Sequence, residues 1–419
     1  MELLRTPAFG RPPRQIDVSI VMPCLNEVQS LPHCIVNARA ALARIEREHG
    51  LTGEIVIADN GSTDGSQQLA TSLGARIVAV ARKGYGAAIL GGFEGALGRF
   101  LIMGDADGSY DFNDSVAMVG RLLDGADLCM GSRFAGGIAP GAMPWKNRYI
   151  GNPALTGILN LLFRSGIDDA HCGLRAIRKD ACLALELQGA GMEFASEMVI
   201  KAAMKGLRIE QVPATLSPDL RDRPPHLRPW RDGWRHLRFL LMFSPTWIFG
   251  VPALAAMVVA LAILLIVALH RTGIIVGSGA FGASWTIVAG FLLTVGHLSA
   301  VMALTCHLYG VRRGYRPLRP ALRRLAPLLT LEHALTVGTL LMLASLGGFA
   351  VIGWRWASGD FVAMPSVLPV TLAAATGALG LQSALGGFLM AIVSGHEAQF
   401  IDSQAKADTP TKSAWRKAA

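Results

Sequence analysis

Charged side chains are scarce in this chain of 419 residues: Asp, Glu, Lys and Arg make up 16%, against 52% hydrophobic residues. Globular proteins usually carry about 25% charged residues. The deficit is uneven, because no long apolar run precedes residue 242, whereas four runs almost free of charge follow it, at 247–269, 285–309, 333–354 and 367–393. Each run has at least the roughly 20 residues that cross a bilayer. The second half is therefore predicted to form four transmembrane helices.

Two further features are missing. The N-terminus has no apolar h-region, so a signal peptide is not expected. No cysteine pair has CxxC spacing, so we expect reduced core thiols rather than a metal or redox site. The cysteines are Cys24, Cys34, Cys129, Cys172, Cys182 and Cys306.

The net charge of +9 comes without a basic stretch interleaved with stacking aromatics, which disfavours nucleic-acid binding. The charge fits attraction to an anionic membrane surface instead. Arginines gather in the loop between the second and third apolar runs, and Lys and Arg recur in the C-terminal tail. By the positive-inside rule, the N-terminal half and the C-terminus are both expected in the cytoplasm, on an inner or plasma membrane.

Short apolar runs alternate with helical patterns in the first half. Strands are predicted at 18–22, 54–58, 76–80, 100–103 and 128–131, and helices at 30–48, 63–73, 86–98 and 112–123. Strand–helix alternation at this spacing predicts a doubly wound α/β sheet covered on both faces. Ligands bind such sheets at the carboxyl ends of the strands.

Polar clusters follow four successive predicted strands: PCLNE at 23–27, DNGSTDG at 59–65, ARKGYGAA at 81–88 and DADG at 105–108. Asp105 and Asp107 lie two residues apart after a strand, so both side chains are expected on one side of the chain. Two adjacent carboxylates repel, and Mg²⁺ or Mn²⁺ together with a diphosphate would relieve that repulsion. The alternative, an aspartate that only caps the helix at 112–123, fits Asp111 or Asn113 better.

These motifs, with GSRF at 131–134, DAHCGLRA at 169–176 and GMEFASE at 191–197, resemble glycosyltransferase family 2. The resemblance covers about residues 18–245 and is strongest to the dolichyl-phosphate mannosyltransferase-like branch, which acts on polyisoprenyl phosphates. It implies a GT-A fold, a nucleotide-sugar donor (a UDP- or GDP-hexose) and an inverting transfer. The expected domains are an arm (1–17), a GT-A domain (18–220), an interfacial amphipathic segment (221–243), a four-helix membrane domain (244–396) and a polar tail (397–419).

The resemblance also suggests residue roles. Asp105 and Asp107 would hold the metal, and Asp107 would be catalytic. Ser62 either assists the donor or caps a helix, and Lys83 either meets phosphate beside Gly84 or is a surface lysine. Asn60 stands where many family members have a second aspartate, which leaves the nucleobase open. The remaining donor-binding candidates are Pro23, Asn26, Glu27 and Asp59.

A polyprenyl phosphate acceptor is largely dianionic at neutral pH, because the second pKa of a phosphate monoester is about 6. Cations are then needed more than a strong base. Arg133 and Arg175 are the catalytic candidates, with Asp169 as a base or an orienting group. Arg148 and the basic stretch before the first span are the acceptor-binding candidates. This stretch contributes Arg221, Arg223 and Arg228.

Other functions remain open from sequence alone. A family 2 enzyme with a different lipid or glycan acceptor would share the same donor motifs, and so would a non-catalytic regulator or lipid-linked sugar flippase. A processive polymer synthase is disfavoured because the chain contains no Gln-x-x-Arg-Trp motif. The sugar, the nucleotide and the oligomeric state are not defined by the sequence.

Overall fold

The computed structural model describes residues 15–221, 229–272, 274, 282–314, 318, 320–362 and 366–401. The chain divides into two compact units, Met1–Leu240 and Leu241–Ala419.

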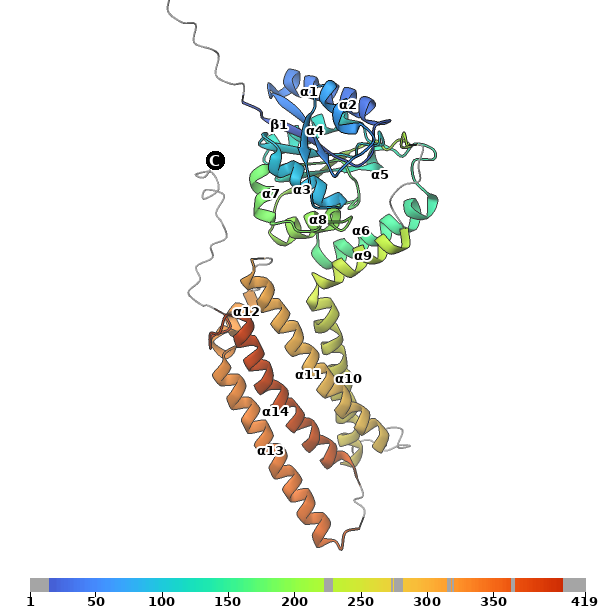
Figure 1. Ribbon diagram of the computed structural model, residues 1–419. Helices are drawn as coiled ribbons and strands as arrows, with labels where there is room; N and C mark the ends of the chain where they lie inside the picture. The colour runs from blue at the N-terminus through green and yellow to red at the C-terminus, as the bar shows by residue number, and fades with distance from the viewer. Residues whose placement is uncertain are drawn as a thin grey trace, which may run out of the picture. The chain divides into compact units, whose positions relative to one another are not determined.

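The first unit is built on one seven-stranded sheet in the order β3-β2-β1-β4-β6-β5-β7 (Figure 1). β1 pairs in parallel with β2 and with β4. β6 runs antiparallel between β4 and β5. The strands are β1 (Val18–Cys24), β2 (Gly53–Asp59), β3 (Arg76–Ala79), β4 (Phe100–Met103), β5 (Leu128–Ser132), β6 (Arg175–Arg178) and β7 (Ile209–Pro213).

The predicted GT-A α/β fold is therefore confirmed, with one correction: the sheet is mixed, and sequence reasoning missed β6 and β7. Alternation along β1 shows how both faces are filled. Ile20 and Met22 belong to the core shared with α1 and α4, whereas Val21 lies against α3 at Gly92. The helices are α1 (Leu31–His49), α2 (Ser66–Ser72), α3 (Tyr85–Gly95), α4 (Ser115–Leu123), α5 (Arg133–Gly136), α6 (Asn152–Phe163), α7 (Lys179–Leu185), α8 (Phe194–Met204) and α9 (Pro229–Met242).

One predicted helix begins later than expected. α2 starts at Ser66 rather than residue 63, and its N-cap is Gly65, at φ 90°, with no side-chain cap. Ser62 is therefore not a helix cap. The capping alternative for Asp111 is confirmed, because its side chain accepts a hydrogen bond from the Asn113 backbone amide before α4.

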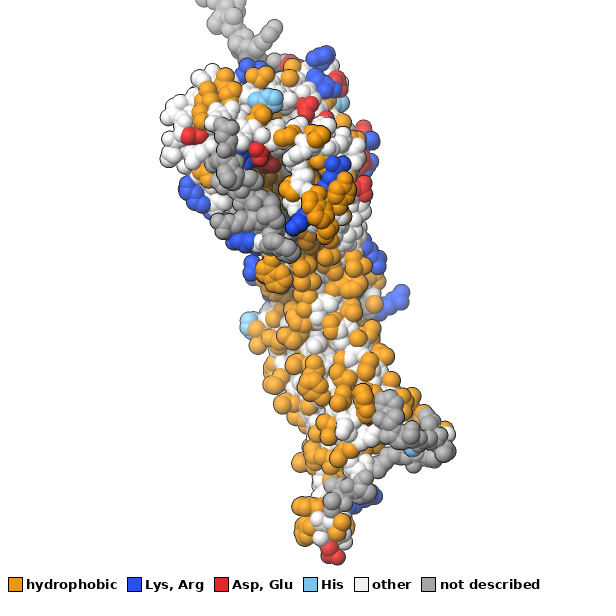
Figure 2. Space-filling view, turned by 90° about the vertical axis from the view of Figure 1, so that its right-hand side faces the viewer, with side chains coloured by type: hydrophobic (Ala, Val, Ile, Leu, Met, Phe, Trp, Pro, Cys, Tyr) orange, Lys and Arg blue, Asp and Glu red, His pale blue; other side chains and the backbone are white. Residues whose placement is uncertain are grey.

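Among the described residues of the second unit, four helices are long and apolar enough to span a membrane: Thr246–His270, Ala283–Arg312, Leu331–Ser358 and Leu368–Val393. They coincide with the four predicted runs. The first combines a π-helical turn (Thr246–Gly250) with α10 (Val251–Arg271), and the others are α11, α13 and α14; α12 (Pro320–Leu325) is a short connector. Figure 2 shows hydrophobic side chains covering these helices, with few charged side chains among them.

Small residues bring α13 and α14 close together. A Cβ placed on Gly380 would lie 2.7 Å from the carbonyl oxygen of Gly338, so the two backbones meet directly. A polar clamp joins α11 to α14: His297 Nδ1 lies 3.0 Å from Gln382 Oε1, and its Nε2 lies 3.3 Å from Ser383 Oγ. His297 and Gln382 therefore pair two of the apolar helices.

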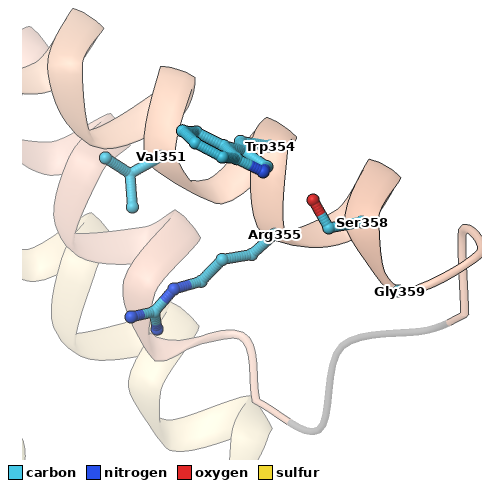
Figure 3. A pocket seen from close by; sticks show the side chains of 5 residues that line it. All are labelled: Val351, Trp354, Arg355, Ser358 and Gly359. Carbon is cyan, nitrogen blue, oxygen red and sulfur yellow. The ribbon is translucent and has the colours of Figure 1, made fainter.

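A shallow hollow lies at the end of α13 (Figure 3). Trp354 and Arg355 leave the helix in different directions there, and Val351, Ser358 and Gly359 complete the lining. None of the lining residues is a carboxylate. The hollow therefore lacks the acidic side chains that are predicted to form a site in the first unit.

Candidate active site at the strand ends

The loops after β1 and β2 are tied to each other by side chains. The backbone amide of Asn26 donates to Ser62 Oγ at 2.9 Å, and Asn26 Oδ1 accepts from the Thr63 amide at 2.8 Å. Asn26 adopts φ 59°, a left-handed conformation that asparagine tolerates better than most residues. These reciprocal bonds fix the position of the PCLNE loop, which begins at the half-buried Pro23.

Asp59 and Asn60, predicted to contact the donor, are largely used inside the protein. The Asp59 carboxylate accepts from the amides of Gly61 and Ser62 and from Gln67 Nε2, and its residue is only 2% exposed. Asn60 donates to the carbonyls of Val80 and Arg82 and accepts from the Gly84 amide. Both side chains therefore hold the loops after β2 and β3, and their predicted contact with the donor stays a prediction.

Gly84 and Gly86 lie where the 188–191 loop packs closely against the start of α3. A Cβ on Gly84 would lie 2.2 Å from the Ala190 carbonyl oxygen, and one on Gly86 would lie 2.2 Å from that of Gly189. The α3 amide of Ala87 donates to Ala190 O at 3.1 Å. Because they have no side chain, the glycines admit the 188–191 loop to the start of α3, and phosphate binding beside Gly84 stays a prediction. Lys83 Nζ, on an exposed side chain, donates to Asn60 O at 2.5 Å.

Asp105 and Asp107 follow β4, as predicted. Burial and the charge of Asp107 raise the pKa of Asp105 to about 7, although a hydrogen bond from Tyr85 opposes the shift. Gly173 leaves room for this carboxylate, because a Cβ there would lie 2.9 Å from Asp105 Oδ2. Asp107 Oδ1 accepts from the Ser109 amide and hydroxyl, at 3.0 and 2.6 Å.

This pair fits a divalent cation. The mutual repulsion of two confined carboxylates is what a bound cation relieves, and Mg²⁺ takes only one or two protein carboxylates beside substrate phosphates. Among the described residues, no group of three or more His, Cys, Asp or Glu side chains is placed to hold a metal.

Arg221, predicted to bind the acceptor, lies on this carboxylate pair. Its Nη2 donates to Asp107 Oδ2, and its Nε lies 3.5 Å from Glu27 Oε2. Glu27 is itself buried, and its amide donates to Ser66 Oγ at 3.1 Å. The guanidinium therefore joins the loop after β1 to the loop after β4.

Arg133 and Asp169 form a buried, two-pronged ion pair. Arg133 Nε and Nη2 each donate to the carboxylate at 2.7 Å, and the two side chains are only 9% and 0% exposed. Burial alone would raise the pKa of Asp169, but the contacts with Arg133 lower it below its usual value. A carboxylate held in this way is a poor base, so the arrangement favours the orienting alternative for Asp169.

Arg175 does not reach the predicted phosphate. It lies in β6 and is fully buried, and its guanidinium donates to the carbonyls of Cys172, Ala195 and Ala170 at 2.8, 2.6 and 2.9 Å. These bonds hold the 170–172 turn against α8. This positioning role is what the structure shows for Arg175, and its predicted contact with substrate stays a prediction.

The remaining acceptor candidates are only partly described. Arg148 lies in a π-helical turn (Asn147–Gly151), with its guanidinium 5.5 Å from the Tyr149 ring centre. Trp145, Tyr149 and Ile150 are 62%, 66% and 57% exposed beside it. Arg223 and Arg228 lie outside the described residues.

Sequence reasoning missed two residue groups that shape the site. Glu197 accepts from the amides of Gln188 and Gly189 and pairs with Lys201 at 2.7 Å, which holds the loop packed on α3. His236 of α9 lies 2.8 Å from Ser196 Oγ, and its ring packs edge-on against His171 at 5.0 Å. The Glu-x-x-x-Lys spacing on a helix was the available signal for the first group.

Comparison with known proteins agrees with this geometry. Residues 19–185 match the family model for glycosyl transferase family 2, and residues 304–394 match the glycosyltransferase family 2 C-terminal transmembrane region. The chain is 35% identical over 375 residues to the low-salt glycan biosynthesis hexosyltransferase Agl6 of Haloferax volcanii, covering 89% of this chain and 88% of that protein.

Two further matches are more distant. Polyprenol monophosphomannose synthase of Mycolicibacterium smegmatis is 28% identical over 224 residues, covering 50% of this chain and 80% of that one. Glucosyl-3-phosphoglycerate synthase of Mycobacterium tuberculosis, crystallised with Mn²⁺, UDP and glucosyl-3-phosphoglycerate, is 20% identical, with a TM-score of 0.41 over 55% of this chain and 80% of that one.

A GT-A sheet with acidic residues after β4 defines a glycosyltransferase class, and the helices of the second unit make it an integral membrane protein. The chain belongs to glycosyltransferase family 2.

Proposed function

We propose that this protein transfers a hexose from a UDP- or GDP-hexose to a membrane polyprenyl phosphate, in glycan or envelope biosynthesis. The names of two relatives, a hexosyltransferase and a polyprenol monophosphomannose synthase, support this proposal. In the transfer, a phosphate oxygen of the acceptor bonds to the anomeric carbon with inversion. The bond from that carbon to the nucleoside diphosphate breaks, and the diphosphate leaves with the electron pair.

The observation that carries the proposal is the state of the carboxylates. Asp169 is neutralised by Arg133, Asp107 by Arg221, and Asp59 accepts three amide groups. None of these three is placed as a base for a hydroxyl acceptor, and the fourth carboxylate of the site, Asp105, is assigned to the divalent cation. A phosphate monoester needs no such base, because it is already ionised near pH 7. The site chemistry therefore favours a phosphate acceptor over a diacylglycerol or a polysaccharide hydroxyl.

A divalent cation held by Asp105 and Asp107 would supply charge stabilisation for the leaving diphosphate. Arg133, oriented by Asp169, would add a cation near the reacting groups. The exposed Trp145, Tyr149 and Ile150, with Arg148 beside them, would bring the first unit to the membrane interface, where aromatic and basic side chains are favoured. Arg223 and Arg228 remain proposed acceptor contacts.

The test is incubation of the purified protein with radiolabelled nucleotide hexoses and a mixture of polyprenyl phosphate, polyprenol and diacylglycerol. Label in a charged, mild-acid-labile lipid is expected. Label only in a neutral lipid would contradict the proposal, and the absence of all transfer would favour a non-catalytic role.

The proposed orientation has its own test. Reporters fused after Ala419 and in the arginine-rich loop at Arg319 should both report the cytoplasm, since the positive-inside rule places both there. A reporter at Gly277 should report the opposite side. A C-terminus on the outer side would overturn the orientation.

A further inference from the structure

The contact between Arg221 and Asp107 joins a basic residue to one of the two carboxylates proposed to hold a metal ion. Asp107 already accepts two hydrogen bonds from Ser109 on its other oxygen. Arg221 occupies the remaining oxygen. A cation bound to Asp107 through that oxygen would therefore have to replace the guanidinium.

Backbone hydrogen bonds place Arg221 on this carboxylate. The Leu220 amide donates to the Asp107 carbonyl at 2.9 Å, and the Ser217 amide donates to the Ser109 carbonyl at 2.9 Å. Leu220 also packs over Gly108, where a Cβ would lie 2.7 Å from its side chain. The 217–220 segment thus runs along the DADGS turn, and Arg221 emerges from it directly beside Asp107.

The local charge explains why a guanidinium is stable there. Asp107, Glu27 and Asp105 all attract the Arg221 guanidinium electrostatically, and Arg221 contacts the first two. The Arg221 side chain is only 15% exposed, so its charge is weakly screened by solvent. Burial opposes the charged form, yet Asp107 and Glu27 raise the pKa of Arg221.

We propose that Arg221 is an internal counter-cation that neutralises Asp107 in the metal-free protein and competes with the divalent ion for it. The inference rests on the proposed metal site at Asp105 and Asp107. The metal affinity then depends on how much more strongly Asp107 binds the cation than it binds the Arg221 guanidinium. In the metal-free protein, the guanidinium keeps the buried charge of Asp107 paired.

A coupling between metal and nucleotide follows from the displacement. A guanidinium released from Asp107 keeps Glu27 as a neighbour and gains a strong reason to pair with a diphosphate, which matches its planar fork. The nucleoside diphosphate should therefore help the metal to bind by giving Arg221 another partner. Linkage requires that the metal help the nucleotide by the same factor.

The first experiment measures Mn²⁺ binding alone to the purified full chain in detergent, by electron paramagnetic resonance titration. Arg221→Gln should bind Mn²⁺ about tenfold more tightly than the wild type, a change comparable to one charge-assisted contact. Arg221→Lys should fall between them, since lysine keeps the charge but lacks the fork. The matched control is Arg44→Gln, which removes an equal charge from a side chain paired with Glu48 on α1.

The Arg44→Gln control should leave Mn²⁺ affinity unchanged. An equal gain in affinity in both variants would show a general charge effect and would overturn the proposal. Unchanged or weaker binding by Arg221→Gln, in protein that retains the wild-type circular dichroism spectrum, would also overturn it. If that variant does not fold, Arg221→Lys carries the test, with the same expected direction.

The second experiment repeats the titrations with saturating UDP or GDP. The nucleotide should tighten Mn²⁺ binding severalfold more in the wild type than in Arg221→Gln. Equal tightening in both proteins would contradict the displacement. Neither experiment uses a sugar or a lipid. An enzyme with another acceptor would therefore give a negative result in the transfer assay for the proposed function, and would still give the expected Mn²⁺ titrations. Absence of Mn²⁺ binding in every protein would overturn the metal site and this inference together.

Discussion

The two units use polar side chains in different ways. At the strand ends of the first unit, carboxylates and amides fasten one loop to the next, as Asp59, Asn60 and Glu197 do. In the second unit, α13 and α14 meet through glycine backbones, and a clamp at His297 supplies polar contact between α11 and α14. Packing of the loops in the first unit therefore depends on particular hydrogen-bonding partners, whereas packing of α13 on α14 in the second unit depends on the small volume of glycine.

The largest expected effect comes from Asp107→Asn. It keeps the shape of the side chain but removes the charge that the cation and Arg221 share, so transfer should fall at least about 100-fold to 1,000-fold. Initial rates with labelled donor would measure the loss. The matched control is Asp168→Asn, on an exposed residue, which should keep wild-type activity. Full activity in a folded Asp107→Asn protein would contradict the proposed metal site.

Asp169→Asn should break the buried pair and leave Arg133 without its counter-charge, at a cost of about 3–5 kcal/mol in the free energy of unfolding. Thermal or denaturant unfolding would measure it. Because the folded pKa of Asp169 is lowered, the contribution of the pair is complete above the unfolded value of about 3.9 and is lost as pH falls through the folded value.

The stability difference between wild type and Asp169→Asn should consequently be constant between pH 5 and pH 7 and should shrink below about pH 4. A difference that grew on acidification would contradict the ion pair. Asp168→Asn again serves as the control.

Gly86→Ala should destabilise the first unit by about 3 kcal/mol, the upper end of the usual cost of overpacking, because the new Cβ meets a fixed backbone carbonyl. That carbonyl is Gly189 O, 2.2 Å away. Gly157→Ala on α6 meets nothing within 4 Å and is the matched control; it should be neutral or slightly stabilising. Equal unfolding curves for Gly86→Ala and wild type would show that the 188–191 loop is not packed on α3.

Gly380→Ala is the corresponding change in the second unit and should have the smallest effect, about 1 kcal/mol, because two neighbouring membrane helices can move slightly apart. Gly347→Ala on α13, with nothing within 4 Å, is its control. Unfolding in detergent would compare them. A loss as large as that of Gly86→Ala would show that the two units do not differ in tolerance to added volume.

Local patterns predicted the parts of this molecule that depend on neighbouring residues in the chain. The four membrane helices, the first five strands and the acidic pair after β4 follow from runs of apolar residues and the residues that end them. Strand β6 was missed because it has four residues and carries Arg at both ends, Arg175 and Arg178. Its backbone pairing with β4 and β5, which the local sequence does not indicate, makes it a strand.

Contacts with residues remote in sequence explain what several predicted site residues do inside the protein. Asn60 bonds to a loop more than 20 positions away, and Gly86 faces a carbonyl at Gly189. Arg221 was predicted to meet a phosphate, and its contact with Asp107 joins residues 114 positions apart. The sequence motif shows that such residues belong to the site, but three-dimensional contact decides whether they face a ligand or hold a loop.

The most direct test of the central claim compares polyprenyl phosphate with polyprenol of the same chain length, at equal concentration in the same detergent, with a donor that the protein accepts. The account predicts transfer to the phosphate and none to the alcohol, because Asp169 is paired with Arg133 and the carboxylates of Asp105 and Asp107 are assigned to the divalent cation. Transfer to polyprenol at a comparable rate would contradict it.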